Sequence, residues 1–133
     1  MNSIKYLDRG HVETFIFRNF LINQIRSGNN VTKEHNEKLE GIIKQYYEER
    51  PMVYISNRVY SYSVDPILYV HTSKITNIRA IAIVTESQIA TMNAEFESKF
   101  YDKPFKVFSE LADAIKWSKS VLSKEKKKLL EES

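Results

Sequence analysis

Three short apolar runs alternate with segments of helical spacing in the second half of the chain, and this alternation constrains the fold more than any other feature. The runs are residues 52–55, 78–85 and 105–108. Each has the length of a buried strand. Asp65-Pro66 and Ser87 are residue types that begin helices, and each follows one of the runs. Because strands that alternate with helices form parallel sheets with right-handed crossovers, we predict an α/β domain.

The first 27 residues have a different pattern, in which β-branched and aromatic residues dominate and only short turns intervene. The expected strands are residues 4–8, 12–17 and 20–26. Short turns join antiparallel neighbours, so these strands are predicted to form a β-meander that leads into the mostly parallel sheet. A helix with Thr32 as N-cap and its end before Pro51 is predicted to connect the two parts.

Two further helices are expected in the C-terminal half. The helix that begins at Ser87 carries an apolar stripe along one side, formed by Ile89, Met92, Phe96 and Phe100. The last helix is predicted to be capped by Ser109. Its inward face is expected to comprise Leu111, Ala114, Ile115, Ser118 and Leu122, with Trp117 and Val121 alongside.

The chain of 133 residues has the length of one domain, which we assign to residues 1–123. Residues 124–133 are expected to be a charged helix extension or a frayed tail. The absence of cysteine excludes disulfides and zinc–thiolate sites within this sequence. No secretory signal is expected at the N-terminus, and no apolar run reaches the roughly 18 residues of a membrane span, so a cytoplasmic location is expected.

The charge pattern and the histidines argue against several functions. The net charge is +3, but both halves of the chain are nearly balanced, so no nucleic-acid-binding face is expected. His11, His35 and His71 are too dispersed to show metal-ligand spacing. No nucleophile elbow, dinucleotide fingerprint or phosphate-binding loop is present in the sequence. We therefore expect no catalysis, no metal and no cofactor.

The loop 56–65 is the strongest candidate for function, because ligands of open α/β sheets bind outside the carboxyl ends of the strands. A helix N-terminus that follows such a loop also favours anions. Glu86 follows the next strand and is expected at the same edge. A surface loop that only caps its helix is the alternative interpretation. The candidate binding residues are Ser56, Asn57, Arg58, Tyr60, Tyr62, Ser63, Asp65 and Glu86.

Two stretches of the sequence carry a family resemblance. Residues 103–117 (KPFKVFSELADAIKW) combine a proline-led strand, a capped helix start and an Ala-x-x-Trp helix. Residues 54–58 (YISNR) through 62–66 (YSVDP) look like a stretch of small Bacteroidetes proteins. Together with the order of elements, these stretches resemble the SpoIIAA-like branch of the STAS superfamily.

The resemblance implies a non-enzymatic regulatory domain that binds a partner protein, as anti-sigma-factor antagonists do. In those proteins, phosphorylation of a serine switches binding. Ser63 takes the roughly corresponding place here, and Ser61 is a further candidate for phosphorylation. Tyr62 and Val64 flank Ser63 where that motif has Asp and then Ser or Gly. We expect changes at Arg58 and Tyr62 to weaken binding with little loss of thermal stability.

Two other expectations involve the aromatic residues, since the chain has eight tyrosines and seven phenylalanines. The alternative function is a carrier or sensor of a small apolar or lipid-like ligand, held in an aromatic-lined pocket. We also expect a homodimer rather than a monomer, because a domain this small can bury exposed aromatics against a second copy.

Overall fold

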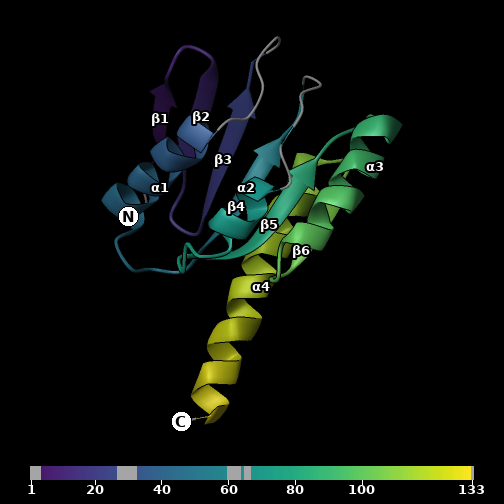
Figure 1. Cartoon of the computed structure of the whole chain (residues 1–133). Helices are drawn as coiled ribbons and strands as arrows, with labels where there is room; N and C mark the ends of the chain where they lie inside the picture. The colour runs from purple at the N-terminus through teal and green to yellow at the C-terminus, as the bar shows by residue number, and fades with distance from the viewer. Residues whose placement is uncertain (1–3, 27–32, 60–63, 65–66, 133) are drawn as a thin grey trace.

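The computed structural model describes residues 4–26, 33–59, 64 and 67–132 of the chain. Within these residues, one six-stranded sheet has its strands in chain order (Figure 1). The strands are β1 (Lys5–Asp8), β2 (Val12–Ile16), β3 (Phe20–Ile25), β4 (Met52–Asn57), β5 (Ile78–Val84) and β6 (Phe105–Phe108). The predicted α/β class and the predicted strands are therefore confirmed, with boundaries shifted by one or two residues.

The direction of the strands changes once across the sheet. β1, β2 and β3 pair antiparallel, whereas β3 with β4, β4 with β5 and β5 with β6 pair parallel. Short turns join the first three strands, and a turn of a few residues can only return the chain antiparallel. Each later connection contains a helix, which carries the chain back to the starting edge. The predicted meander and the parallel part are thus both confirmed.

Helices cover both faces of the sheet. They are α1 (Lys33–Tyr47), α2 (Ile67–Thr72), α3 (Gln88–Glu97, followed by the 3₁₀ turn η1 at Ser98–Phe100) and α4 (Leu111–Glu132). Side chains of α1, α2 and α3 join the apolar cluster on one face, and those of α4 join the cluster on the other. Figure 1 shows α4 crossing behind the sheet and continuing well beyond its lower edge. No helix among the described residues is long and apolar enough to cross a membrane.

Small residues lie where α4 packs on β5. Ala80 and Ala82 of β5 and Ala114 and Ser118 of α4 are all fully buried. Small side chains let a helix approach a sheet closely, and the Ser118 hydroxyl donates to the Ala114 carbonyl at 2.8 Å rather than being left unpaired. The inward face predicted for the last helix is therefore confirmed. The helix begins at Leu111, however, so Ser109 lies two residues before it rather than at the cap position.

Helix α3 exposes the more apolar of its two sides. The residues it buries are Ala94 and Glu97. The apolar stripe noted in the sequence faces away from the sheet, with exposed fractions of 73% for Ile89, 63% for Met92, 53% for Phe96 and 37% for Phe100. Ser87 caps the helix as predicted, since its Oγ accepts the Ala90 N–H at 3.2 Å. Sequence periodicity identified the helix and its stripe, but not the direction that the stripe faces.

Tyr47, at the end of α1, fixes the turn between β2 and β3. Its side chain is fully buried, and its hydroxyl lies 2.6 Å from the Phe17 carbonyl oxygen and 2.8 Å from that of Phe20. Burial raises the pKa of this phenol far above its ordinary value. The hydroxyl therefore stays protonated and donates to these two acceptors.

Replacing Tyr47 by Phe is expected to lower the free energy of unfolding by about 1–2 kcal/mol, because the part-buried Phe17 carbonyl oxygen loses this donor while packing is kept. The Phe20 carbonyl oxygen still accepts the Phe17 N–H at 3.0 Å. Tyr46→Phe removes a hydroxyl from the neighbouring, half-buried residue and serves as the control. Urea unfolding followed by circular dichroism measures both variants. An equal loss in the two would show that the buried hydroxyl of Tyr47 has no special role.

Candidate functional site

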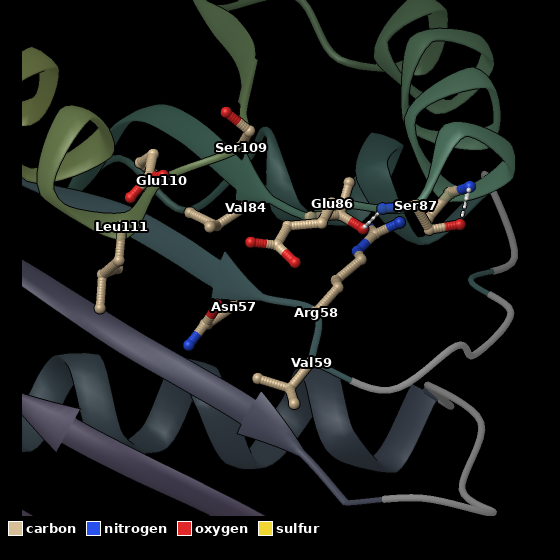
Figure 2. A pocket seen from close by; sticks show the side chains of 11 residues that line it. Asn57, Arg58, Val59, Val84, Glu86, Ser87, Ser109, Glu110 and Leu111 are labelled. Carbon is tan, nitrogen blue, oxygen red and sulfur yellow. Dashed lines mark hydrogen bonds between the residues drawn. The ribbon is translucent and has the colours of Figure 1, made fainter.

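A half-open cavity of about 410 Å³ lies at the carboxyl ends of β4, β5 and β6 (Figure 2). Three loops surround it, each following one of these parallel strands. Its lining residues are Asn57, Arg58, Val59, Val84, Thr85, Glu86, Ser87, Ala90, Ser109, Glu110 and Leu111. We call it the rim cavity. Its position is the one expected for a binding site in an open α/β sheet.

Backbone hydrogen bonds hold the loops side by side. The Arg58 N–H donates to the Val84 carbonyl at 2.8 Å, and the Thr85 N–H donates to the Phe108 carbonyl at 2.9 Å. The strand ladders therefore continue one residue beyond β4 and β5. The Thr85 hydroxyl then accepts the Ser87 N–H at 3.2 Å, which turns the chain into α3 (Figure 2). Hydrogen bonds thus hold the backbone where the loops after β4 and β5 begin.

The structure brings together part of the predicted site. Asn57, Arg58 and Glu86 line the rim cavity. Ser56 does not: its side chain is buried at 4% exposure on the face of the sheet that α1 and α2 cover. Tyr60, Ser61, Tyr62, Ser63 and Asp65 lie outside the described residues. Phosphorylation of Ser63 or Ser61 accordingly stays a prediction.

Arg58 lines the cavity, but its guanidinium forms a buried ion pair with Glu97. Nη1 donates to Oε2 of Glu97 at 3.1 Å, and Nη2 donates to Oε1 at 2.7 Å. Tyr69 completes the cluster, since Arg58 Nη2 donates to its hydroxyl at 2.9 Å and this hydroxyl donates to Glu97 Oε1 at 2.6 Å. The side chains of Arg58 and Glu97 are 4% and 5% exposed. Burial raises the pKa of Tyr69 well above its ordinary value, which keeps this donor protonated.

This buried cluster changes the role expected for Arg58. A guanidinium that is neutralised by a bidentate carboxylate is a weak receptor for a second anion. The structure also does not support the expectation that Arg58 can be changed with little loss of stability, because its removal leaves Glu97 buried without its counter-charge. Sequence reasoning missed Glu97, which lies 39 residues away on another element.

Sequence reasoning also missed the third loop of the rim cavity. Ser109, Glu110 and Leu111 follow β6 and close one side of it (Figure 2). A signal was available, because a third parallel strand must end at the same edge as the first two. Glu86 and Glu110 are both exposed, so two carboxylates stand at the mouth of the cavity. With Arg58 neutralised, the mouth favours a positively charged or hydrogen-bond-donating group.

A second, much smaller cavity lies between the sheet, α1 and α2. Its volume is about 40 Å³, which is space for roughly one water molecule. Tyr54 and Tyr69 are among its lining residues, together with Leu39 and Leu68. Pockets for small apolar ligands measure roughly 300–1,000 Å³. A ligand carrier would need this space to enlarge, and the carrier function stays a prediction.

The fold brings two of the dispersed histidines together. The rings of His11 and His35 pack edge to face with their centres 5.0 Å apart. Burial lowers the pKa of His35, and the neighbouring His11, Arg9 and Lys38 lower it further. No group of three or more possible metal-ligating side chains gathers among the described residues. Sequence reasoning did not find this pairing, because 24 residues separate the two histidines.

Comparison with known proteins gives the family. The model of the SpoIIAA-like family matches residues 22–119, which is most of the chain. The chain belongs to the SpoIIAA-like family. A crystal structure of an uncharacterised protein from Shewanella loihica PV-4, of the DUF3478 family and with a SpoIIAA-like fold, is similar at 14% sequence identity. The match has a TM-score of 0.53 and covers 88% of this chain and 93% of that one.

These findings confirm the resemblance noted in the sequence. They assign no role to any residue of the site. No curated protein matches the chain. The structural likeness to the Shewanella protein, at this identity, shows the fold alone. For this SpoIIAA-like domain, the rim cavity and the buried ion pair beside it are therefore the observations on which function has to be based.

Replacing Arg58 by Met is expected to lower the free energy of unfolding by about 3–5 kcal/mol, because Glu97 is left as a buried, unpaired charge. The double variant Arg58→Met/Glu97→Leu should recover most of this loss, since it removes both charges. Chemical unfolding of the two single variants and the double variant gives the coupling energy.

The matched control for this cycle is the half-exposed pair of Arg79 and Glu125, whose Nε–Oε1 distance is 3.3 Å. Arg79→Met should cost less than about 1 kcal/mol, because a solvated ion pair contributes little. Similar losses at Arg58 and Arg79 would contradict the importance given to the buried pair.

Acidification is expected to destabilise the domain through His35. Its folded-state pKa lies below the ordinary value, so protonation is harder in the folded than in the unfolded state. The contribution is fully present above about pH 6.5 and is lost as the pH falls from there towards the folded-state pKa. Melting temperatures between about pH 7.5 and 5.5 should fall less steeply for His35→Gln than for the wild type. His71→Gln, at an exposed histidine, should keep the wild-type slope.

Proposed function

We propose that this SpoIIAA-like domain is a non-enzymatic regulatory domain of the cytoplasm that binds a partner protein at the rim cavity. The observation that carries the proposal is that residues following β4, β5 and β6 converge on one half-open cavity. The proposal retains Asn57 and Glu86 from the sequence analysis as binding residues. It adds Ser109 and Glu110, and it gives Arg58 a supporting rather than a contacting role.

The polar groups around the cavity favour recognition over catalysis. The hydroxyls of Thr85 and Ser87 already accept hydrogen bonds from the backbone of the β5–α3 turn and the first turn of α3. Arg58 is paired with Glu97 on the inner side. A catalytic site needs an activated nucleophile or an acid–base pair aimed at a substrate. These groups instead hold the surrounding loops in place, which is what a preorganised binding surface needs.

The mouth of the cavity indicates the chemistry of the partner. Glu86 and Glu110 are exposed carboxylates, and Val59 between β4 and the following loop is an apolar residue at 58% exposure. A lysine or arginine side chain of the partner protein fits this combination, since its aliphatic stem can pack on Val59 while its charge meets the carboxylates. The volume of about 410 Å³ accommodates such a side chain.

Site-specific photo-crosslinking in the native host tests the proposal. A photoreactive amino acid at Val59 should trap a partner protein, and the charge reversal Glu86→Lys/Glu110→Lys should reduce the yield at least tenfold. Ile4 and Glu49 provide matched controls, because both are exposed and lie where β1 and β4 begin, at the opposite edge of the sheet.

The photoreactive group at Ile4 should trap no partner, and Glu49→Lys should leave the yield at Val59 unchanged. Capture of the same protein at Ile4, or an unchanged yield after reversal of both rim carboxylates, would contradict binding at the rim cavity. Circular dichroism of each variant verifies that the fold is kept.

A further inference from the structure

The apolar stripe of α3 is the largest run of exposed apolar side chains on one helix of the described chain. Ile89, Met92, Phe96 and Phe100 follow one another along the outer side of α3 and η1, over about 16 Å of helix length. Phe96 and Phe100 already contact each other, with ring centres 5.5 Å apart. In Figure 1, α3 lies at the end of the helical layer, beside the β6 edge of the sheet. Single exposed apolar residues are ordinary, but a continuous stripe of four marks an interface.

We infer that α3 forms the interface of a homodimer, in which the α3 helices of two copies pack antiparallel through this stripe. This inference concerns a surface separate from the rim cavity. The cavity is lined by Ser87 and Ala90 from the first turn of α3, and no residue of the stripe is among its lining residues. A dimer formed through the stripe therefore leaves both rim cavities free for partners.

The order of residues along the stripe favours a second copy in antiparallel orientation. The aliphatic residues lie at the N-terminal end and the aromatic residues at the C-terminal end. Antiparallel packing places Phe100 of each copy against Ile89 of the other, and Phe96 against Met92. Large side chains then meet smaller ones along the whole contact, which favours close packing. A two-fold axis makes every such contact occur twice.

The exposed area is sufficient for a modest dimer interface. With roughly 200 Å² for a large apolar side chain, the four exposed fractions amount to about 450 Å² per copy. Two further exposed apolar residues, Ile67 and Val70, lie on α2, which packs against η1. Polar residues at the margin extend this area towards the roughly 800 Å² that each partner contributes to a standard interface.

Sedimentation equilibrium of the full chain tests the homodimer. The wild type should have the mass of two chains at micromolar concentration. Phe96→Glu should raise the dissociation constant at least about 100-fold, because a hot-spot loss of about tenfold is counted twice in a symmetric dimer. Leu129→Glu is the matched control, since Leu129 is 60% exposed on α4 and outside the interface. Met92→Lys provides a second interface variant in case Phe96→Glu fails to fold.

A one-chain mass of the wild type at sub-millimolar concentration would overturn the homodimer and assign the stripe to a different protein. A dimer that survives both Phe96→Glu and Met92→Lys but dissociates with Leu129→Glu would overturn the choice of surface. Neither result affects binding at the rim cavity, which the crosslinking at Val59 measures separately.

Cysteine crosslinking tests whether the two helices are antiparallel. Because the sequence contains no cysteine, only the introduced cysteines can react. The double variant Ile89→Cys/Phe100→Cys should form a covalent dimer with a short bifunctional maleimide. Each single variant should remain a single chain, because identical residues lie at opposite ends of an antiparallel pair, about 16 Å apart. Efficient crosslinking of the single variants would instead establish a parallel pair and overturn the proposed arrangement.

Discussion

The buried ion pair of Arg58 and Glu97 is the interaction on which the arrangement of elements at the carboxyl ends of the parallel strands depends. It joins the end of β4 to the last turn of α3, and Tyr69 adds α2 to the same cluster. Charges removed from water are tolerated only where geometry and hydrogen bonding are nearly complete. The cluster meets this condition with a bidentate contact and a shared phenol. The three elements are consequently held in one fixed relation at the carboxyl edge of the sheet.

This constraint also explains the orientation of α3. Glu97 has to face inward to reach Arg58, and Ala94 lies on the same inner side. Residues about a quarter to a half turn away then face solvent, which places Phe96 and Met92 on the outside. One buried carboxylate therefore links two surfaces, since it supports the loops of the rim cavity and exposes the stripe. The proposed partner site and the proposed dimer interface are therefore separate surfaces.

Much of the site could be inferred from local sequence, and its missing parts have identifiable reasons. Asn57 and Glu86 were found because both lie at the carboxyl ends of apolar strands that pair in parallel. Ser109 could have been found by the same argument applied to β6. Glu97 could not, because nothing in the pattern of α3 distinguishes a buried carboxylate from the solvated ones around it. Its partner lies 39 residues away, and only folding brings the two together.

The sequence by itself determined the alternation of strands and helices, the antiparallel meander and the inward face of α4. These features depend on local spacing, turn length and capping residues, all of which act over a few positions along the chain. The tertiary structure alone decided that Arg58 is neutralised, that His11 meets His35, and that the apolar side of α3 faces outward. Each of these is a contact or an orientation that segments distant in sequence determine. The periodicity of a helix shows which residues share a side, but it does not show which side packs against the rest of the protein.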